Sequence, residues 1–178
     1  MSARGPVSDG RRANDWGAAR TKTITWYDPA IALAAAPKMA GREFLQAILD
    51  GELPRPPFAA LTGAELVSVD NGVAVFRCAP DESTYNPLGL VHGGTVCTLL
   101  DSAAGCAVQT QLPAGVGITS IEIKVSFLSA VRADSGTLEI EGHALRVGRQ
   151  VAFAEAHARA AGGKLVGHAT TSMALARG

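Results

Sequence analysis

A single acidic residue lies in the most apolar stretch of the sequence. Between Glu82 and Glu122, Asp101 is the only residue with a formal charge, and it falls two turns into a helical run of apolar side chains. An ionised carboxylate that is buried without partners is costly, so such a group is paired, neutralised or functional. We expect Asp101 to be functional, the alternative being a side chain that faces solvent or bonds a loop amide. The residues one helical turn away are small enough to admit a ligand or a second chain: Cys97, Thr98, Ala104 and Gly105.

A histidine and two glycines begin the same helix and could stabilise negative charge. His92, Gly93 and Gly94 follow the loop that starts at Asn86. The free N–H groups and the positive end of the helix dipole lie at this point, and glycine lets an oxygen approach the backbone closely. Such an N-terminus can bind a developing oxyanion, although most Gly-Gly pairs are turns and a lone histidine is more often a capping or packing residue.

The spacing between these two features predicts a site shared by two chains. Gly93 and Asp101 are eight residues apart in the sequence, which places them about 12 Å apart along one helix. Two groups that act on one carbonyl must each come within roughly 3 Å of the reacting atoms. If both are catalytic, the helix start of one subunit must face Asp101 of another. We therefore expect a homodimer with two equivalent sites, or a dimer of dimers.

The elements that must position these residues follow from hydrophobic periodicity. Residues 93–110 carry apolar side chains at helical spacing, with few charges on the opposite side, which predicts a buried central helix. Strands joined by hairpins form an antiparallel sheet that must bury one face. We therefore predict an α+β fold, a curved antiparallel sheet wrapped around the central helix. Alternating patterns place about six strands near 66–69, 73–76, 121–127, 136–147, 150–161 and 165–175.

Three details of these strands can be predicted. Asn71-Gly72 between two alternating runs indicates a hairpin. The alternating alanines of residues 150–161 favour helix by propensity, but their period of two and the flanking turns favour strand. In the strand before Phe127, we expect Ile121, Ile123, Val125 and Phe127 on one face, and Ser120, Glu122, Lys124 and Ser126 on the other.

The chain divides into three parts by composition. Residues 1–37 show no sustained period and are expected to be a loosely ordered extension, in which residues 23–27 are the candidates to dock onto the body. Residues 38–56 are expected to hold a short helix from Gly41 to Leu53 and a proline-rich extended linker. Residues 57–178 are expected to form the main domain.

Composition also excludes several classes of function. Sixteen Lys and Arg balance 16 Asp and Glu, so the net charge favours neither nucleic acid nor an anionic membrane as a partner. The three cysteines lack CxxC spacing, which indicates a reducing cytoplasm rather than a disulfide framework. With no long apolar run and no signal peptide, we expect neither a membrane span nor secretion. The four histidines show no metal-binding spacing, so no metal and no cofactor are expected.

From about Pro57 to Ala176 the sequence resembles the hotdog-fold acyl-CoA thioesterases of the phenylacetate-pathway (PaaI-like) group. The resemblance is most specific at Asn86, at His92-Gly93-Gly94 and at Asp101. It implies a hotdog fold and hydrolysis of an acyl-CoA thioester, with aromatic and medium-chain acyl groups equally open. Acyl-CoA is then the expected partner.

The resemblance also implies a role for each matching residue. Asp101 would activate water as general base or attack the thioester carbonyl itself. The Gly93 N–H would stabilise the oxyanion, His92 would position the thioester, and Asn86 would orient water or support the loop. Ser120 would help to hold Asp101. Candidate substrate-binding residues are Gly94, Cys97 and Thr119, the last being the neighbour most easily confused with Ser120. Arg146 and Arg149 are basic residues near strand ends and are the candidates to bind the CoA phosphates.

Other functions compete with this one. A hydratase or dehydratase acting on acyl thioesters would need an acid and a base at the α and β carbons, for which His92 and Asp101 could be recruited. A non-catalytic acyl-CoA-binding module would bind ligand without turnover. Cys97 as nucleophile is disfavoured, because a thiol within an apolar helix turn is usually an inert packing residue.

Overall fold

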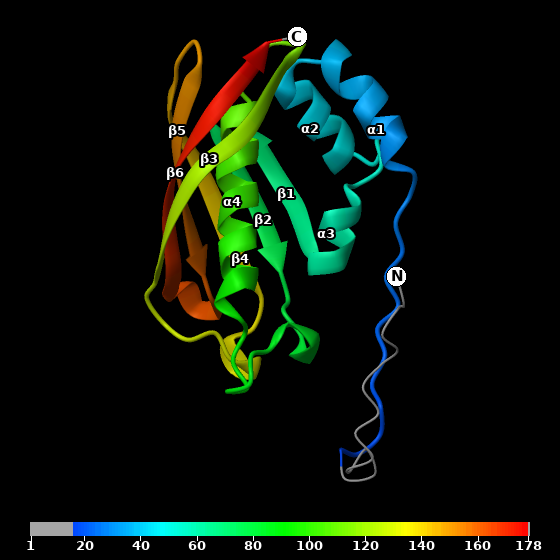
Figure 1. Ribbon diagram of the computed structural model, residues 1–178, viewed down its shortest axis with the longest axis vertical. Helices are drawn as coiled ribbons and strands as arrows, with labels where there is room; N and C mark the ends of the chain where they lie inside the picture. The colour runs from blue at the N-terminus through cyan, green and yellow to red at the C-terminus, as the bar shows by residue number, and fades with distance from the viewer. Residues whose placement is uncertain (1–15, 178) are drawn as a thin grey trace, which may run out of the picture.

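One antiparallel sheet curves around one long helix in the computed structural model, which describes residues 16–177 (Figure 1). The sheet has six strands in the spatial order β1-β2-β4-β5-β6-β3, and every neighbouring pair is antiparallel. This is the α+β hotdog arrangement predicted from the sequence. The strands are β1 (Ala64–Asp70), β2 (Val73–Cys78), β3 (Val116–Phe127), β4 (Leu138–Val147), β5 (Val151–Arg159) and β6 (Leu165–Arg177).

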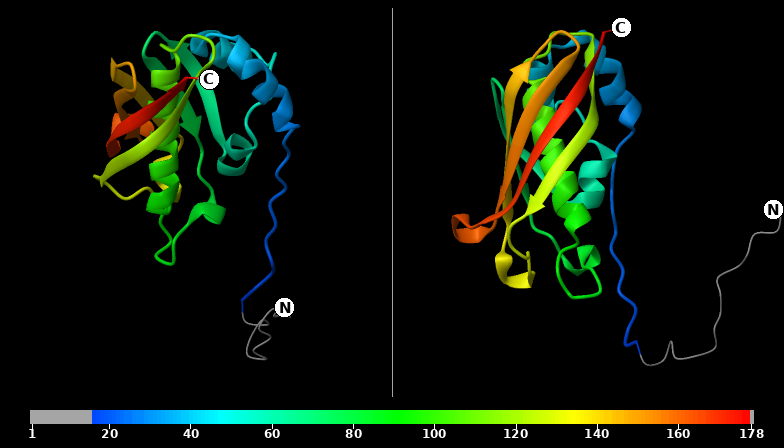
Figure 2. Two further views of the ribbon diagram at one scale, coloured as in Figure 1. Left: turned by 45° about the horizontal axis from the view of Figure 1, so that its top comes forward. Right: turned by 60° about the vertical axis from the view of Figure 1, so that its left-hand side comes forward.

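The central helix α4 (Gly93–Gln109) lies in the hollow of the sheet, as Figure 2 shows from two further sides. It packs on β2, β3, β4, β5 and β6 with its apolar face, while the face that carries Asp101 and Ser102 is half-buried. Its apolar residues are accordingly buried, among them Leu99 and Leu100. Burial at period 3.6 on a helix of this length confirms the predicted core helix.

Small residues let α4 lie close to the middle of the sheet. The inward-facing residues of β5 are alanines, and Ala152, Ala154, Ala156 and Ala158 are almost fully buried. On β4, a Cβ added to Gly142 would lie 2.2 Å from the backbone oxygen of Ala103 in α4. The alanine-rich segment is therefore a strand, as its two-residue period predicted, and alanine is there because nothing larger fits beneath the helix.

The predicted hairpin is present between β1 and β2. Asp70 pairs with Val73, which leaves Asn71 and Gly72 as the two-residue turn. Gly72 has a φ of +77°, which glycine adopts without steric cost. Its N–H donates to the buried Thr110 Oγ1 at 2.8 Å, so the turn is attached to the residue that follows α4.

A bulge in β3 changes which of its residues face the helix. The pairing with β6 passes from Ser120–Met173 to Glu122–Ser172, so Ile121 is the extra residue. An extra residue reverses the alternation of faces. The prediction that Ile121 shares the buried face of Ile123 is therefore wrong, because Ile121 is 59% exposed, while Ser120 turns toward α4.

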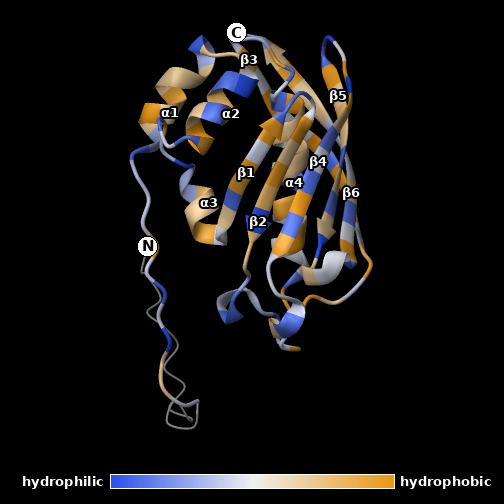
Figure 3. Ribbon diagram, turned by 180° about the vertical axis from the view of Figure 1, so that it is seen from behind, coloured by the Kyte–Doolittle hydropathy of each residue, from blue (hydrophilic) through white to orange (hydrophobic). Residues whose placement is uncertain are grey.

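Three helices precede the sheet, and two of them contact β1. They are α1 (Pro29–Ala35), followed by a single 3-10 turn (Ala36–Lys38), α2 (Gly41–Leu49) and α3 (Pro57–Thr62). Figure 3 shows them beside the sheet, from which α2 and α3 contact β1. The sequence predicted α2 but neither α1, within the extension, nor α3, which begins at the last proline of the expected linker. Proline is favoured at the first turn of a helix because its missing N–H is not needed there.

The extension follows the surface before it reaches α1. Arg20 pairs with Glu82, and Lys22 Nζ lies 2.7 Å from Asp81 Oδ2. The hydrogen bonds from Lys22 and Ser83 lower the pKa of Asp81 to about 2, so this pair stays charged at neutral pH. The expectation of loose order for residues 1–15 lies outside the described residues. Within residues 16–177, no helix is long and apolar enough to cross a membrane.

Candidate active site

Asp101 and Ser120 face each other between α4 and β3. Ser120 Oγ donates a hydrogen bond of 2.7 Å to Asp101 Oδ1. Asp101 is half-buried and has no cation beside it, and Oδ2 accepts no hydrogen bond from residues 16–177. The bulge at Ile121 is what turns Ser120 toward the helix. Ser120 thus holds one carboxylate oxygen and leaves the other available to a ligand.

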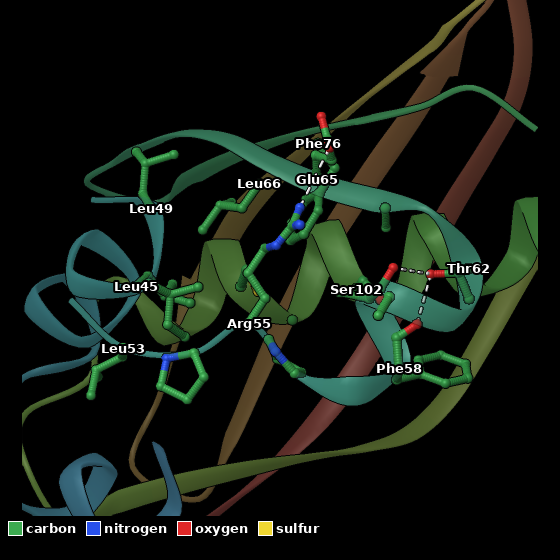
Figure 4. A pocket seen from close by; sticks show the side chains of 18 of the residues that line it. Leu45, Leu49, Leu53, Arg55, Phe58, Thr62, Glu65, Leu66, Phe76 and Ser102 are labelled. Carbon is green, nitrogen blue, oxygen red and sulfur yellow. Dashed lines mark hydrogen bonds and ion pairs between the residues drawn. The ribbon is translucent and has the colours of Figure 1, made fainter. Parts of the chain in front are cut away.

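A cavity of about 730 Å³ opens beside this pair. Asp101, Thr119 and Ser120 line one wall, together with Cys106 of α4. The opposite wall comes from β1, α2, α3 and the segment before α1 (Figure 4). Its lining there is mostly apolar and includes Leu45, Ile48, Leu49, Leu53, Phe58, Leu66 and Phe76.

Among the described residues that line the cavity, Arg55 is the only cation. Its Nη1 lies 3.4 Å from Glu65 Oε1, and Figure 4 shows the side chain extending between the apolar residues toward that carboxylate. The sequence analysis did not single out Arg55, nor the helices that line this wall. Arg55 lies among prolines without any motif, so only the fold reveals that it reaches the cavity.

The start of α4 carries the residues that were expected to stabilise an oxyanion. His92 is the N-cap residue, and its Nδ1 accepts the Gly94 N–H at 2.9 Å. The Gly94 N–H is therefore already used, whereas within residues 16–177 nothing accepts the Gly93 N–H. A Cβ added to Gly93 would lie 3.1 Å from Cζ of Phe127, so that ring covers the glycine closely. Gly93 thus presents a free donor next to an aromatic ring.

Asn86 organises the loop that leads to this helix start. Its Oδ1 accepts the N–H groups of Leu88 at 2.9 Å and of Leu90 at 3.2 Å. Its own N–H donates to the Leu90 carbonyl at 2.8 Å, and its carbonyl accepts from Gly89. Two roles were expected for Asn86, orienting water and supporting the loop, and these hydrogen bonds fit the second.

The thiols near Asp101 are held in their neutral form. Desolvation, and then the charge of Asp101, raise the pKa of Cys97 above its usual value and that of Cys106 to about 12. A thiol with a raised pKa is a poor nucleophile. This agrees with the expectation that Cys97 is not the nucleophile.

The structure places these candidate residues in four regions. Asp101, Thr119 and Ser120 share the cavity, while His92, Gly93 and Gly94 lie two turns away at the helix start. Cys97 lies one turn before Asp101 and does not line the cavity. Arg146, at the end of β4, and Arg149, in the turn before β5, do not line it either.

Comparison with known proteins identifies the family. The thioesterase superfamily matches residues 88–167, which include Asp101, Ser120 and the helix start. "Putative esterase SSO2140" of Saccharolobus solfataricus is 30% identical over 113 residues, or 64% of this chain and 79% of that protein. The chain belongs to the thioesterase superfamily.

Three further relatives align with shorter stretches of this chain. The 1,4-dihydroxy-2-naphthoyl-CoA hydrolase of Listeria monocytogenes is 28% identical over 87 residues, 49% of this chain and 69% of that enzyme. The chain spans about half the length of its relatives from Halobacterium salinarum and Caenorhabditis elegans, with 44% and 54% of those proteins aligned.

Solved structures share the fold. A phenylacetic acid degradation-related protein of Ralstonia eutropha superposes with a TM-score of 0.67 at 28% identity, covering 72% of this chain and 97% of that one. The PaaI protein of Escherichia coli also gives a TM-score of 0.67, at 21% identity, covering 79% and 97%. The second match establishes the hotdog fold alone, because its identity is low.

Proposed function

We propose that this protein hydrolyses acyl-CoA thioesters to the free acid and CoA. The observation that carries the proposal is Asp101, held by Ser120 at 2.7 Å, on the wall of an otherwise mostly apolar cavity. A thioester needs a nucleophile and a donor for the oxyanion, because the thiolate is a good leaving group. The relative from Listeria monocytogenes is named for hydrolysis of an aromatic acyl-CoA, which supports this substrate class.

Asp101 supplies the basic oxygen of the reaction. Oδ2 either takes a proton from water as that water attacks the thioester carbon, or attacks the carbon itself. In the first route a C–O bond forms, the C–S bond breaks, and the proton held by Asp101 passes to the departing thiolate. In the second route the bond from Oδ2 to the carbon forms as the C–S bond breaks, and water then hydrolyses the resulting anhydride, which frees the acid, restores the carboxylate and supplies the proton for the thiolate. Ser120 fixes the carboxylate in both routes, so both depend on the same pair.

The oxyanion donor is the Gly93 N–H of a second chain. Within one chain Gly93 and Asp101 are both on α4, about 12 Å apart along its axis. They cannot both reach one carbonyl, so a second copy must bring its own helix start to Asp101. The exposed edge of the sheet at β3, with Ile121 and Phe127, is the surface on which we place this copy.

The cavity wall of α2, α3 and β1 receives the acyl group. Its leucines, isoleucine and phenylalanines offer apolar contact for an aromatic or medium-chain acyl group. The volume of about 730 Å³ accommodates groups of that size. Thr119 of the same chain, and the helix start with His92 and Gly94 of the second chain, are then placed beside the thioester, with Cys97 one turn from Asp101. The CoA phosphates have Arg146 and Arg149 as candidates near the strand ends.

The decisive test replaces the proposed base without changing its shape. Asp101→Asn should lower kcat/KM for acyl-CoA hydrolysis by at least about 10²-fold, because the amide cannot accept a proton or attack. Thiol release across a panel of aromatic and medium-chain acyl-CoAs measures this, with the melting temperature showing that the variant folds.

Two results would contradict the proposal. Unchanged turnover in Asp101→Asn removes this residue from the mechanism. Saturable acyl-CoA binding by the unaltered protein, with no thiol released from any member of the panel, indicates a binding module instead.

A further inference from the structure

Two histidines and a glutamate gather on the face of the sheet that points away from α4. His157 of β5 pairs directly with His168 of β6, and Glu155 precedes His157 by two residues on the same face. The alanines that alternate with them, Ala154, Ala156 and Ala158, face the helix instead. The right-hand view of Figure 2 shows β5 and β6 from this outer side, with α4 behind them. The cluster is therefore separated from Asp101 by the thickness of the sheet.

The three side chains are already close enough to share one ligand. One imidazole nitrogen or carboxylate oxygen of each lies within 4.8 Å of the others. The rings of His157 and His168 have centroids 4.7 Å apart, and His168 Nε2 lies 3.5 Å from Glu155 Oε2. Donor atoms around a tetrahedral zinc ion are about 3.3 Å apart, so each must move by less than about 1 Å to reach that geometry.

The chemistry of the donors selects a class of ion. Two imidazoles and one carboxylate are the ligands that Zn²⁺ takes when a fourth position is left for water. All three residues are half-buried, and they project from adjacent strands of a continuous sheet, which fixes their backbones.

We propose that Glu155, His157 and His168 form a binding site for Zn²⁺ or a similar divalent transition metal on the outer face of the sheet. The bound ion links β5 to β6 and stabilises the folded chain. It takes no part in thioester hydrolysis, since it lies on the opposite face of the sheet from Asp101. The inference is therefore independent of the proposed function.

A neighbouring histidine provides a matched control. His143 of β4 lies on the same face, but its Nε2 pairs with Glu141 Oε1 at 3.1 Å, and its ring centroid is 6.5 Å from that of His157. It is outside the set of three donors that lie within reach of one another. Replacing it removes one imidazole from the same surface and leaves the proposed site whole.

The experiment titrates Zn²⁺ into the tag-free, chelator-stripped protein by calorimetry at neutral pH. We expect saturable binding of one ion per chain and a rise in melting temperature on binding. His157→Gln, His168→Gln and Glu155→Gln should each weaken binding at least about 10-fold, because loss even of an outer partner of a ligand costs that much. His143→Gln should leave the affinity unchanged.

Cobalt distinguishes this site from the cysteines. The absorption spectrum of the Co²⁺ form should show bound metal without a thiolate-to-cobalt band, because only nitrogen and oxygen ligands are proposed. The melting temperatures of the metal-free variants show whether each one folds. Absence of saturable Zn²⁺ binding, a thiolate band, or full binding by the His157→Gln/His168→Gln double variant would each overturn the site.

Discussion

Asp101 has a single polar side-chain partner in a helix that otherwise buries apolar residues. The hydroxyl of Ser120 holds Oδ1, and nothing within residues 16–177 neutralises the charge. A hydrogen bond to a charged group contributes more than one between neutral groups, so Ser120 fixes the carboxylate in the cavity wall. In the proposed mechanism Asp101 reacts and Ser120 positions it.

Removing the Ser120 hydroxyl should weaken catalysis less than changing Asp101 does. Ser120→Ala should lower kcat/KM about 10-fold, because the carboxylate loses one charge-assisted hydrogen bond but keeps its basic oxygens. The measurement is thiol release from acyl-CoA. Ser172→Ala is the matched control, since Ser172 Oγ donates to Glu122 at 2.8 Å on the outer face. Equal activity in both variants would contradict the positioning role of Ser120.

Close packing on β4 and β5 fixes the position of α4, the helix that carries Asp101. Gly142 and the buried alanines allow this approach, and they leave no space for larger side chains. In contrast, α2 and α3 reach the cavity from outside the sheet and contact mainly β1, with a smaller contact between α2 and α4. The helix that carries Asp101 is therefore fixed by the core, while the wall facing it is attached at the periphery.

A single methyl group tests this packing. Gly142→Ala should lower the free energy of unfolding by about 1–3 kcal/mol, because the added Cβ would meet the backbone of Ala103. Gly117→Ala is the control, since its Cβ would find its nearest atom 4.0 Å away. Urea denaturation midpoints measure both variants. Equal midpoints would show that α4 moves away from β4 without cost.

At the scale of the whole molecule, the proposed site is completed by two copies of the chain. Each proposed site needs Asp101 from one chain and the Gly93 N–H from another, so a dimer holds two sites made of opposite halves. Variants that damage different halves should therefore compensate each other in a mixed dimer, because one of its two sites then carries both intact groups.

Subunit mixing measures this compensation. Asp101→Asn and Gly93→Pro are each expected to be inactive, the second because proline lacks the N–H. After free exchange at equal amounts, about a quarter of the normal activity should return, since half of the dimers are mixed and each has one intact site. Gly93→Ala keeps the N–H but meets the same Phe127 ring, so it controls for the steric effect. No recovery between folded, exchanging variants would contradict the shared site.

The sequence predicted the elements that carry strong periodicity and missed those that tertiary contacts decide. The central helix, the Asn71-Gly72 hairpin and the alanine strand follow from local patterns, and all three are confirmed. The bulge at Ile121 could not be predicted, because it is settled by pairing with a distant strand. Arg55 could not be predicted as a cavity residue either, because it reaches the cavity only when the helices before the sheet have packed. The outer histidines come together only when β5 pairs with β6.

The two walls of the cavity differ in how freely their residues can change. One wall is formed by Asp101, Ser102 and Cys106 of α4, and the opposite side of this helix packs on the inward alanines and Gly142, where an enlarged side chain would destabilise the protein. The wall made by α2 and α3 borders open space, and Phe58 is 52% exposed. Evolution, or an engineer, could therefore exchange residues on this outer wall to select a new acyl group, while the reactive helix stays the same.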